Sequence, residues 1–457
     1  MTTYSAVRTT GIYCRPGCGA QPRAENVRTF ELAAAAEAAG YRACLRCRPY
    51  RVAGTVADDA PELVCRAVQL LIGGVLDEAG EAELGGRLGL SARHLRRLFH
   101  DHLGVTPDQF ARSRRAHFAR RLLDDSELSV ADVAFASGFG SLRQFNRTMR
   151  EVFRYSPREL RERRRRTDRL AADGGLVLRM PFTAPYDWDA VLGFLAERAV
   201  PGVESVASGT YRRTITLDGA PGMIEIGPGG DDHLRLRAHL PYWEGVIHVV
   251  ERAGRLVGLD AEPLLAATQL AGDPVVGPLI GARPGVRVPG VWGPFEVAVH
   301  AVLCQTAAGQ FTDGAAARED IGRLAADHGE PVPGLGHGLT HAFPSAAVLA
   351  EASGASGVSP IVGGLARAVV AGTVSLDGGA SLAELVGALL AVPGVEESTA
   401  HHIALRLGAR DAFPAADPTL RGYGADASER WRPWRALAAI HLMTAPTPRG
   451  TSGGRPS

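Results

Sequence analysis

Residues 10–18 read TGIYCRPGC and residues 41–49 read YRACLRCRP. The first stretch holds Cys14 and Cys18 in a C-x3-C spacing, and the second holds Cys44 and Cys47 in a C-x2-C spacing. Two close pairs of cysteines offer four thiolates, the soft ligands that tetrahedral zinc binds at about 2.3 Å. The spacing therefore predicts a zinc site. A zinc knuckle that only stabilises a small domain uses the same ligands, so the pattern alone leaves the role of the metal open.

The charges of the chain are divided unevenly between its two halves. Over 457 residues, 50 basic side chains, all of them arginine, nearly balance 49 acidic ones. Residues 1–170, however, hold 29 arginines against 20 acidic residues, whereas the remainder holds 21 against 29. A basic front half predicts a polyanionic partner for that half. Because the chain has no lysine, chemistry through a lysine Schiff base is excluded.

The sequence gives no indication of a membrane or of secretion. No run approaches the roughly 18 consecutive apolar residues of a membrane span. The first residues, MTTY, do not begin a charged-then-apolar leader, and four of the six cysteines lie within the first 47 residues. In a reducing compartment such clustered cysteines indicate metal binding rather than disulfides. We therefore expect a cytoplasmic protein that does not bind membranes.

Composition divides the chain into segments. Residues 1–52 are rich in cysteine and loop-like, and 52–59 read as a hinge. Residues 61–166 and 286–445 repeat apolar residues at three- and four-residue steps, which is typical of helices. Residues 175–285 contain short apolar runs between Gly/Pro turns and read as an α+β unit. The tail, 446–457, is rich in Pro, Gly, Ser, Thr and Arg and is expected to be disordered.

The α+β unit is predicted in more detail from its local pattern. Four strands are expected, at 176–178, 214–217, 223–226 and 234–237. Two helices are expected, at 188–199 and 244–253. The whole chain is therefore predicted to be a multidomain α+β protein, with a small zinc domain, an all-α domain, an α+β domain and a second all-α domain.

Two similar helical units lie about fifty residues apart in the first all-α segment. In each unit a helix ends at glycine, and a serine, Ser91 or Ser141, precedes the next helix as its cap. That next helix carries long polar side chains: Arg93, His94, Arg96 and Arg97 in the first unit, and Arg143, Gln144, Asn146 and Arg147 in the second. Such donors suit base edges and phosphates of the DNA major groove. Amphipathic helices with solvated arginine faces are the alternative.

The segment around the cysteines resembles the zinc domain of the Ada methylphosphotriester-repair family, over residues 10–18, 23–27 and 38–49. The resemblance implies that Cys14 irreversibly takes a methyl group from a methylated DNA phosphotriester while the other three cysteines remain ligands. Four thiolates around Zn²⁺ carry a charge of about −2, and methylating one reduces it to about −1. Weaker repulsion from DNA phosphates would then tighten DNA binding.

The helical pair resembles the AraC-type DNA-binding domain. The fifty-residue offset, the connecting helix expected at 116–123, and Phe145, Phe153 and Leu160 match the pattern of that family. The resemblance implies promoter DNA as the partner, with RNA polymerase as a further one, and the protein is expected to be a monomer.

The rear of the chain resembles the AlkA-type DNA glycosylases over about 176–445. Residues 185–204 resemble their TBP-like α+β domain, and 297–305 the helix that enters their helical bundle. Residues 389–395, 411–417 and 430–435 resemble their helix-hairpin-helix and closing segment.

The AlkA resemblance implies roles for two residues. Gly394 would contact the DNA backbone at the hairpin. The carboxylate of Asp417 would stabilise the cationic sugar as an N-alkylated purine leaves a flipped nucleotide. The missing lysine fits monofunctional hydrolysis, because strand cleavage by such enzymes needs an amine nucleophile. The alternative for Asp417 is a helix cap before Pro418.

Several positions depart from the AlkA pattern. Glu396 replaces the second hairpin glycine, so we expect a positive φ there, at a cost of about 1–2 kcal/mol. The base-pocket positions are held by Phe194, Ser398, His402 and Met443, of which only the first is aromatic. Pro418 also replaces an aromatic, and Thr306 stands where the loop that fills the gap left by the base needs a larger apolar residue. Two hypotheses stay open: an active glycosylase, or a methylation-sensing transcription regulator with a degenerate glycosylase domain.

The remaining cysteines, tryptophans and paired histidines are expected to be structural. Cys65 and Cys304 lie in apolar helical patterns and are expected in the core. The two tryptophans at 431 and 434 are expected to hold the last helices together. His401 and His402 are adjacent and point in different directions on a helix, which favours packing over metal binding.

Overall fold

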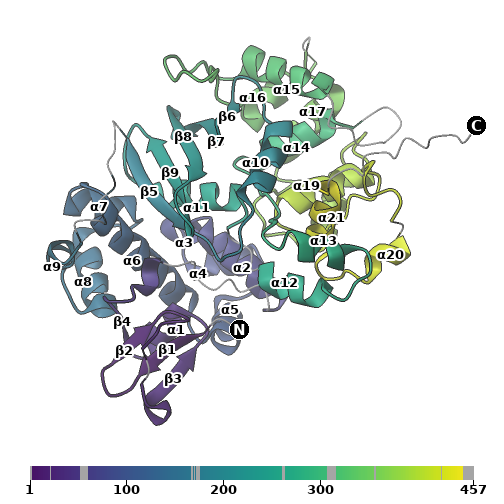
Figure 1. Ribbon diagram of the computed structural model, residues 1–457. Coiled ribbons are helices and arrows are strands. Elements are labelled where there is room, and N and C mark those ends of the chain that lie inside the picture. Colours follow the sequence, from purple (N-terminus) through teal and green to yellow (C-terminus); the bar gives the residue numbers. More distant parts are fainter. Residues whose placement is uncertain are drawn as a thin grey trace, which may run out of the picture.

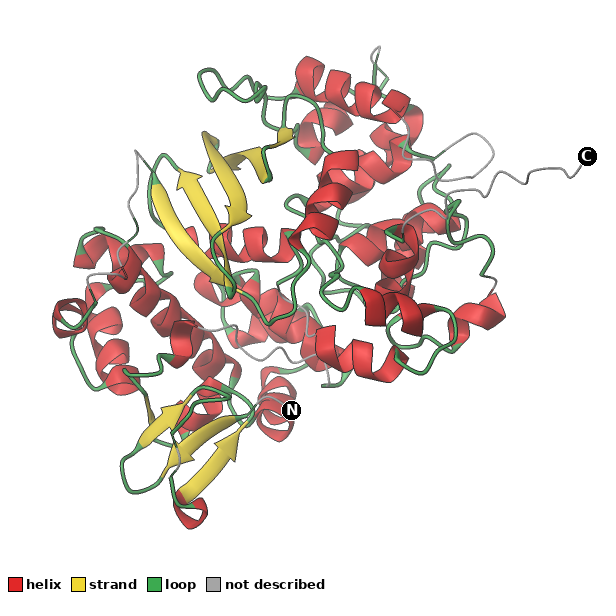
Figure 2. Ribbon diagram, viewed as in Figure 1, coloured by secondary structure: helices red, strands yellow, loops and turns green. Residues whose placement is uncertain are grey.

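The computed structural model describes residues 3–20, 22–51, 60–165, 168, 170, 175–259, 263–305, 315–354, 357–423 and 425–445. Within these ranges the chain forms a small sheet, two groups of helices and a larger sheet, which confirms the multidomain α+β class (Figures 1 and 2). The expected hinge at 52–59, Thr306 and the tail at 446–457 lie outside the described residues. None of the described helices combines the length and apolar character of a membrane crossing.

The small sheet is built from the cysteine-rich segment, in the strand order β3-β1-β2-β4. Its strands are β1 Tyr4–Val7, β2 Ile12–Cys14, β3 Val27–Phe30 and β4 Arg42–Ala43. The helix α1 (Ala33–Ala38) and the 3-10 turns η1 (Ala24–Asn26) and η2 (Pro49–Arg51) complete it. The sequence reads as loop-like here because strands this short cannot display an alternating pattern.

The next elements are helices: α2 Glu62–Ile72, α3 Val75–Glu78, α4 Glu81–Gly86, α5 Ala92–Leu103, α6 Pro107–Asp125, α7 Val130–Ala136, α8 Leu142–Phe153 and α9 Pro157–Glu162. The predicted caps are confirmed, because the Ser91 hydroxyl accepts from the His94 N–H and the Ser141 hydroxyl from the Gln144 N–H. The connecting helix α6 is longer than expected. It begins after Thr106, whose capping box with Gln109 satisfies the first backbone N–H groups.

The larger sheet is antiparallel, in the order β5-β9-β8-β7-β6. Its strands are β5 Leu176–Pro181, β6 Glu204–Ala207, β7 Thr210–Leu217, β8 Ala220–Pro228 and β9 His233–His239. The helices α10 (Trp188–Glu197) and α11 (Val246–Leu256) agree with the expected pair to within a few residues. The strand β6 was not expected; it is half-exposed along its length and shows no apolar alternation.

The rear of the chain is helical: α12 Pro263–Leu270, α13 Val276–Ala282, α14 Pro294–Leu303, α15 Ala315–His328, α16 Ala346–Glu351, α17 Pro360–Val370, α18 Leu382–Leu390, α19 Glu397–Arg406, α20 Ala425–Glu429 and α21 Arg435–Met443. Trp431 and Trp434 are buried in its core, as is Cys304. Cys65 is partly buried against the core beneath α2 and α5.

The hydrophobic cores cross the segment boundaries that composition indicates. The first helix-turn-helix unit packs in a core that includes Val64, Leu84 and Phe99 and that also takes in Leu32 and Ala34 of the cysteine-rich segment. The second unit instead shares one continuous core with both the small and the larger sheet, as Tyr13, Phe153 and Leu178 show. A third core holds the rear helices and takes in Phe194 from α10. The two sheets are therefore joined through the second helix-turn-helix unit, which lies between them in Figure 1.

Candidate functional site

The four N-terminal cysteines converge because the strands that carry two of them are neighbours. Strands β2 and β4 pair in parallel with Tyr13 opposite Ala43. Cys14 and Cys44 are the next residues of the two segments, so they lie side by side where this pairing ends. The Cys44 N–H donates to the Tyr13 carbonyl at 2.9 Å. Cys18 returns through a turn in which its N–H donates to the Arg15 carbonyl, and Cys47 lies in the turn that follows β4.

The sulfurs are close enough to bind one metal ion. Those of Cys14, Cys18 and Cys47 lie within 4.8 Å of one another. A tetrahedral Zn²⁺ with bonds of about 2.3 Å needs sulfurs about 3.8 Å apart. The fourth, Cys44, hydrogen-bonds with the thiols of both Cys14 and Cys47. The sulfurs of Cys14, Cys18 and Cys47 therefore fit a metal that prefers thiolate ligands, such as zinc, and Cys44 lies beside them.

The crowded thiols perturb each other's ionisation. Burial, together with the Cys47 and Cys44 thiols, raises the pKa of Cys14. For Cys44, burial acts to raise the pKa, whereas hydrogen bonds from the N–H groups of Cys47 and Arg46 to its sulfur act to lower it. Together the hydrogen bonds outweigh burial, so the pKa of Cys44 is lowered. The Arg15 N–H donates to the Cys47 sulfur at 3.4 Å. Several thiolates can share this space only when a cation offsets their repulsion, which is the role of a divalent metal here.

The two predicted recognition helices present most of their polar residues to solvent. On α5, Arg93, His94, Arg96 and Arg97 are exposed, and on α8, Arg143 and Arg147 are exposed while Gln144 and Asn146 are half-buried. Some of these groups have partners within the protein. Arg96 pairs with Glu81, and the Asn146 side-chain amide donates to the Leu142 carbonyl at 2.8 Å. Arg147 also lies 3.8 Å from Glu151, so part of the exposed positive charge on each helix is paired within the protein.

The hairpin between α18 and α19 is exposed and turns at Gly394, whose φ is +90°. A Cβ there would lie 2.8 Å from the Ile361 side chain, so the position requires glycine. The strain expected at Glu396 is wrong, because its φ is −90° with ψ 157°, an extended conformation open to any residue. Glu396 instead begins α19 as its N-terminal cap residue.

Gln305, after the end of α14, holds this hairpin in place. Its side-chain nitrogen donates to the Gly394 carbonyl at 2.7 Å, and its oxygen accepts from the Glu396 N–H at 3.0 Å and the Thr399 hydroxyl at 2.8 Å. No role was predicted for Gln305, because its partners lie about ninety residues away in the sequence. A polar residue directly after the apolar last turn of α14 is the signal that could have indicated it.

Asp417 is buried and already serves a local turn. Its Oδ1 accepts from the Thr419 N–H at 2.9 Å and from the Thr419 hydroxyl at 2.6 Å. These contacts form a turn and not the helix cap considered as the alternative role, since no helix begins between Asp417 and Tyr423. The preceding residue, Ala416, donates its N–H to the Ser398 hydroxyl at 3.2 Å, so the structure brings Ser398 and the Asp417 segment together.

The other pocket candidates lie in the core of the rear half. His402 is one turn after Ser398 on the same face of α19, and burial with Arg198 and Arg406 nearby holds its pKa well below its usual value. Phe194 is buried, and the guanidinium carbon of Arg198 lies 3.8 Å from its ring centroid. Met443, at the end of α21, packs partly buried against the same core.

Three known protein families match separate stretches of the chain. Residues 2–50 match the family described as the metal binding domain of Ada, 84–163 a helix-turn-helix domain, and 177–293 the AlkA N-terminal domain. The chain is 39% identical, over 96% of its length and 92% of the relative, to a probable bifunctional transcriptional activator/DNA repair enzyme AlkA of Mycobacterium tuberculosis.

Two relatives from Escherichia coli match separate parts of the chain. DNA-3-methyladenine glycosylase 2 is 30% identical over 56% of this chain and 93% of that protein. The bifunctional transcriptional activator/DNA repair enzyme Ada is 33% identical over 34% of this chain and 43% of that protein. These matches define the class as fusions of an Ada-type front half with an AlkA-type rear half. Within it, the chain belongs to the family of bifunctional transcriptional activator/DNA repair enzymes of the AlkA type.

Proposed function

We propose that this protein senses and repairs alkylated DNA, with a methyl-accepting zinc centre, a promoter-binding helix-turn-helix pair and a monofunctional DNA glycosylase in one chain. The observation that carries the proposal is the cluster of the Cys14, Cys18 and Cys47 sulfurs, with Cys44 beside them, in a chain that matches an AlkA-type bifunctional relative over 96% of its length.

At the front, Cys14 is the methyl acceptor. Zinc, when bound, keeps the four thiols deprotonated at neutral pH. The Cys14 sulfur attacks the methyl carbon of a DNA methylphosphotriester, a C–S bond forms, and the C–O bond breaks. Its electron pair stays on the phosphate oxygen, which leaves a normal phosphodiester and a thioether on Cys14. Since this thioether is stable, each molecule reacts once.

The helix-turn-helix pair turns this reaction into a transcriptional response. The exposed arginines of α5 and α8 contact promoter DNA, and loss of one negative charge at the metal centre strengthens the hold on the duplex. We further propose that the protein acts as a cytoplasmic monomer and that RNA polymerase is the partner of the promoter-bound form.

At the rear, the glycosylase half hydrolyses the N-glycosidic bond of alkylated purines of the 3-methyladenine type in double-stranded DNA. Gly394 and its neighbours contact the backbone, and the damaged nucleotide is flipped toward the Ser398–His402 face of α19. The bond from C1′ to the base nitrogen breaks with its electron pair on the base. Asp417 stabilises the cationic sugar, and water adds to C1′ with loss of a proton.

A second candidate is a transcription regulator whose glycosylase half is degenerate. Two contacts favour it: the guanidinium of Arg198 lies over the Phe194 ring, and one Asp417 oxygen is committed to Thr419. The two candidates share the whole front half and differ in whether free base is released.

Base release from a methylated duplex separates the two candidates. Wild-type protein should release 3-methyladenine, and Asp417→Asn should lose at least about a hundredfold in rate, the order expected when transition-state charge loses its partner. Asparagine keeps the oxygen that accepts from Thr419, so the free energy of unfolding should stay within about 0.5 kcal/mol. Asp417→Ala should lose both release and about 1 kcal/mol of stability. No release by wild-type protein at any concentration would favour the regulator.

A further inference from the structure

Tyr13 and Arg48, the neighbours of Cys14 and Cys47 in the sequence, both contact α6, the helix that joins the two helix-turn-helix units. Tyr13 immediately precedes Cys14, and its hydroxyl donates to Glu37 Oε1 at 2.6 Å. The same carboxylate oxygen lies 2.6 Å from His117 Nε2 on α6. Tyr13 is fully buried at this contact, so the first cysteine pair is held against α6 through its neighbour.

The second cysteine pair is anchored to Asp168, which follows α9, and to Asp124, two turns further along α6. Arg48 follows Cys47 with a φ of +52°, and its N–H donates to the Cys44 carbonyl at 3.0 Å, which closes the ligand turn. Its guanidinium lies 2.5 Å from Asp168 and 3.9 Å from Asp124. Since His117 and Asp124 are seven residues apart, they lie on one face of α6.

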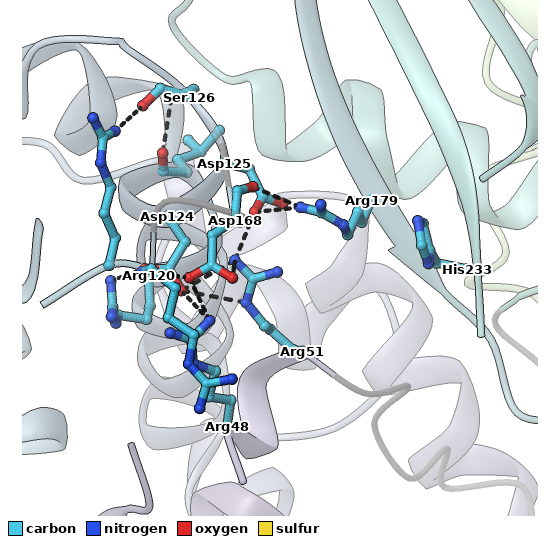
Figure 3. A network of polar contacts seen from close by, with 12 residues as sticks. Arg48, Arg51, Arg120, Asp124, Asp125, Ser126, Asp168, Arg179 and His233 are labelled. Carbon is cyan, nitrogen blue, oxygen red and sulfur yellow. Dashed lines mark hydrogen bonds and ion pairs between the residues drawn. The ribbon is translucent and has the colours of Figure 1, made fainter. Parts of the chain in front are cut away.

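An Arg–Asp cluster extends this second anchor toward the larger sheet (Figure 3). Arg51, at the end of η2, lies 2.7 Å from Asp125 and 3.3 Å from Asp124. Asp125 also accepts from Arg179 of β5 at 2.8 Å, and the same Arg179 nitrogen donates to the Asp168 carbonyl at 2.9 Å. The Asp125 carboxylate at the end of α6 thus contacts both the cysteine-rich segment, through Arg51, and the AlkA-like half, through Arg179.

The burial of this cluster makes the connection energetically important. The side chains of Asp124 and Asp125 are 0% and 2% exposed, and that of Arg48 is 9% exposed. A buried charge that loses its partner is strongly destabilising, because it can be neither solvated nor compensated. Movement of the cysteine-rich segment on α6 would therefore take the Arg51 charge away from Asp124 and Asp125 and leave Arg179 as a remaining partner of Asp125.

We infer that α6 positions the two cysteine pairs of the metal centre, and that the cluster of Arg48, Arg51, Asp124, Asp125 and Asp168 couples that centre to the AlkA-like half through Arg179. The inference rests on the proposed zinc site. A change at the metal centre then reaches β5 as well as the helix between the two recognition helices.

Hydrogen exchange of the full chain, with and without zinc, tests the coupling. Zinc content is measured first, and a wild-type chain that holds none would overturn the metal assignment and the inference with it. In zinc-loaded wild-type protein, removal of the metal by a chelator should raise exchange about tenfold both at 118–125 and at 176–181. A zinc-loaded chain whose exchange at 176–181 stays unchanged on removal would overturn the coupling alone.

Arg179→Gln is the matching variant, with Arg235→Gln as its control. Arg235 lies opposite Arg179 on β9 and is exposed. In Arg179→Gln, zinc removal should still raise exchange at 118–125 but no longer at 176–181. The control should behave as wild-type protein does. If both variants keep the zinc effect at 176–181, the route through Arg179 is wrong.

Competition for zinc by a chelator tests the positioning role. Arg48→Gln should lose zinc about tenfold more readily, because the ligand turn is no longer held on α6. Arg46→Gln changes an exposed arginine of the same turn and should keep the wild-type affinity. Asp168→Asn removes the charge partner of Arg48 and leaves the ligand turn itself unchanged, so it should also make the chain lose zinc more readily. This second variant provides the test if the Arg48 variant does not fold. Wild-type affinity in Asp168→Asn would overturn the positioning role.

Discussion

His441, near the end of α21, is almost completely buried. Burial, with smaller contributions from Arg283 and Arg287, lowers its pKa to about 4. The folded state therefore favours the neutral ring, whereas the unfolded chain takes up the proton near its ordinary pKa of about 6.5. Between these values the unfolded state binds more protons, so stability falls as the pH falls.

Substitution of His441 measures how much of the loss of stability at acid pH comes from this residue. Unfolding free energy should decrease from about pH 6.5 toward pH 4, with His441 contributing up to about 3 kcal/mol of the loss. His441→Leu should make the decrease smaller by that share. Ile440→Val, which changes a buried apolar residue of the same helix, serves as the control and should lower stability without changing the pH profile. An equal decrease in the His441 variant would show that other groups cause the acid loss.

Single residues also show where prediction from sequence succeeds. The four cysteines were predicted as neighbours because the spacing within each pair constrains them locally, and strand pairing then joins the pairs. Glu396 was predicted to be strained, but backbone dihedrals depend on how the hairpin meets α19 and not on residue type. The roles of Asp417, Ser398, His402 and Met443 in a base pocket stay predictions.

At the scale of elements, the hairpin between α18 and α19 depends on Gly394. Gly394→Ala forces a positive φ on a residue with a side chain and places its Cβ 2.8 Å from Ile361. We expect a loss of about 1–2 kcal/mol in the free energy of unfolding and weaker binding to DNA. The matched control is Gly387→Ala in the preceding helix α18, where no atom lies within 4 Å of the new Cβ.

The control should change in the opposite direction. Gly387 is an exposed interior position of α18, and alanine there should stabilise the helix by about 0.5–1 kcal/mol. Denaturant unfolding of both variants gives the comparison. A Gly394→Ala chain as stable as wild type would mean that the hairpin adjusts without strain.

Helices were easier to predict than the small sheet for a physical reason. Caps such as Ser91 and Ser141 act within four residues, so the sequence reveals them directly. Strands β2 and β4 owe their existence to partners elsewhere in the chain, and at three and two residues they carry no pattern of their own. The half-exposed strand β6 escaped prediction for the same reason.

At the scale of the whole molecule, the separation into a basic front and an acidic rear predicts how binding depends on salt. The affinity of the full chain for duplex DNA should fall steeply with salt concentration, because each neutralised phosphate releases a counterion. Arg143→Gln on α8 should reduce the slope of log K against log salt by about 1. Arg235→Gln on β9 should leave it unchanged. A flat salt response of the wild-type chain would contradict the assignment of the basic half as the DNA-binding half.

The division into segments was predicted, but the way they pack was not. Composition marks where helices give way to strands, yet it carries no information on which apolar faces meet. The second helix-turn-helix unit buries its residues against both sheets, so Phe153 and Leu178 belong to one core. The Arg–Asp cluster also joins residues from distant parts of the chain, such as Arg51 and Asp125, and only the folded structure shows it.

The central claim is that Cys14 accepts a methyl group while its three neighbours hold the metal. The direct measurement is mass spectrometry of peptides from the zinc-loaded full chain after incubation with duplex DNA that carries methylphosphotriesters. The account predicts one added methyl group, on Cys14, and none in a Cys14→Ser chain. Methyl on Cys18, Cys44 or Cys47, or on no cysteine at all, would contradict it.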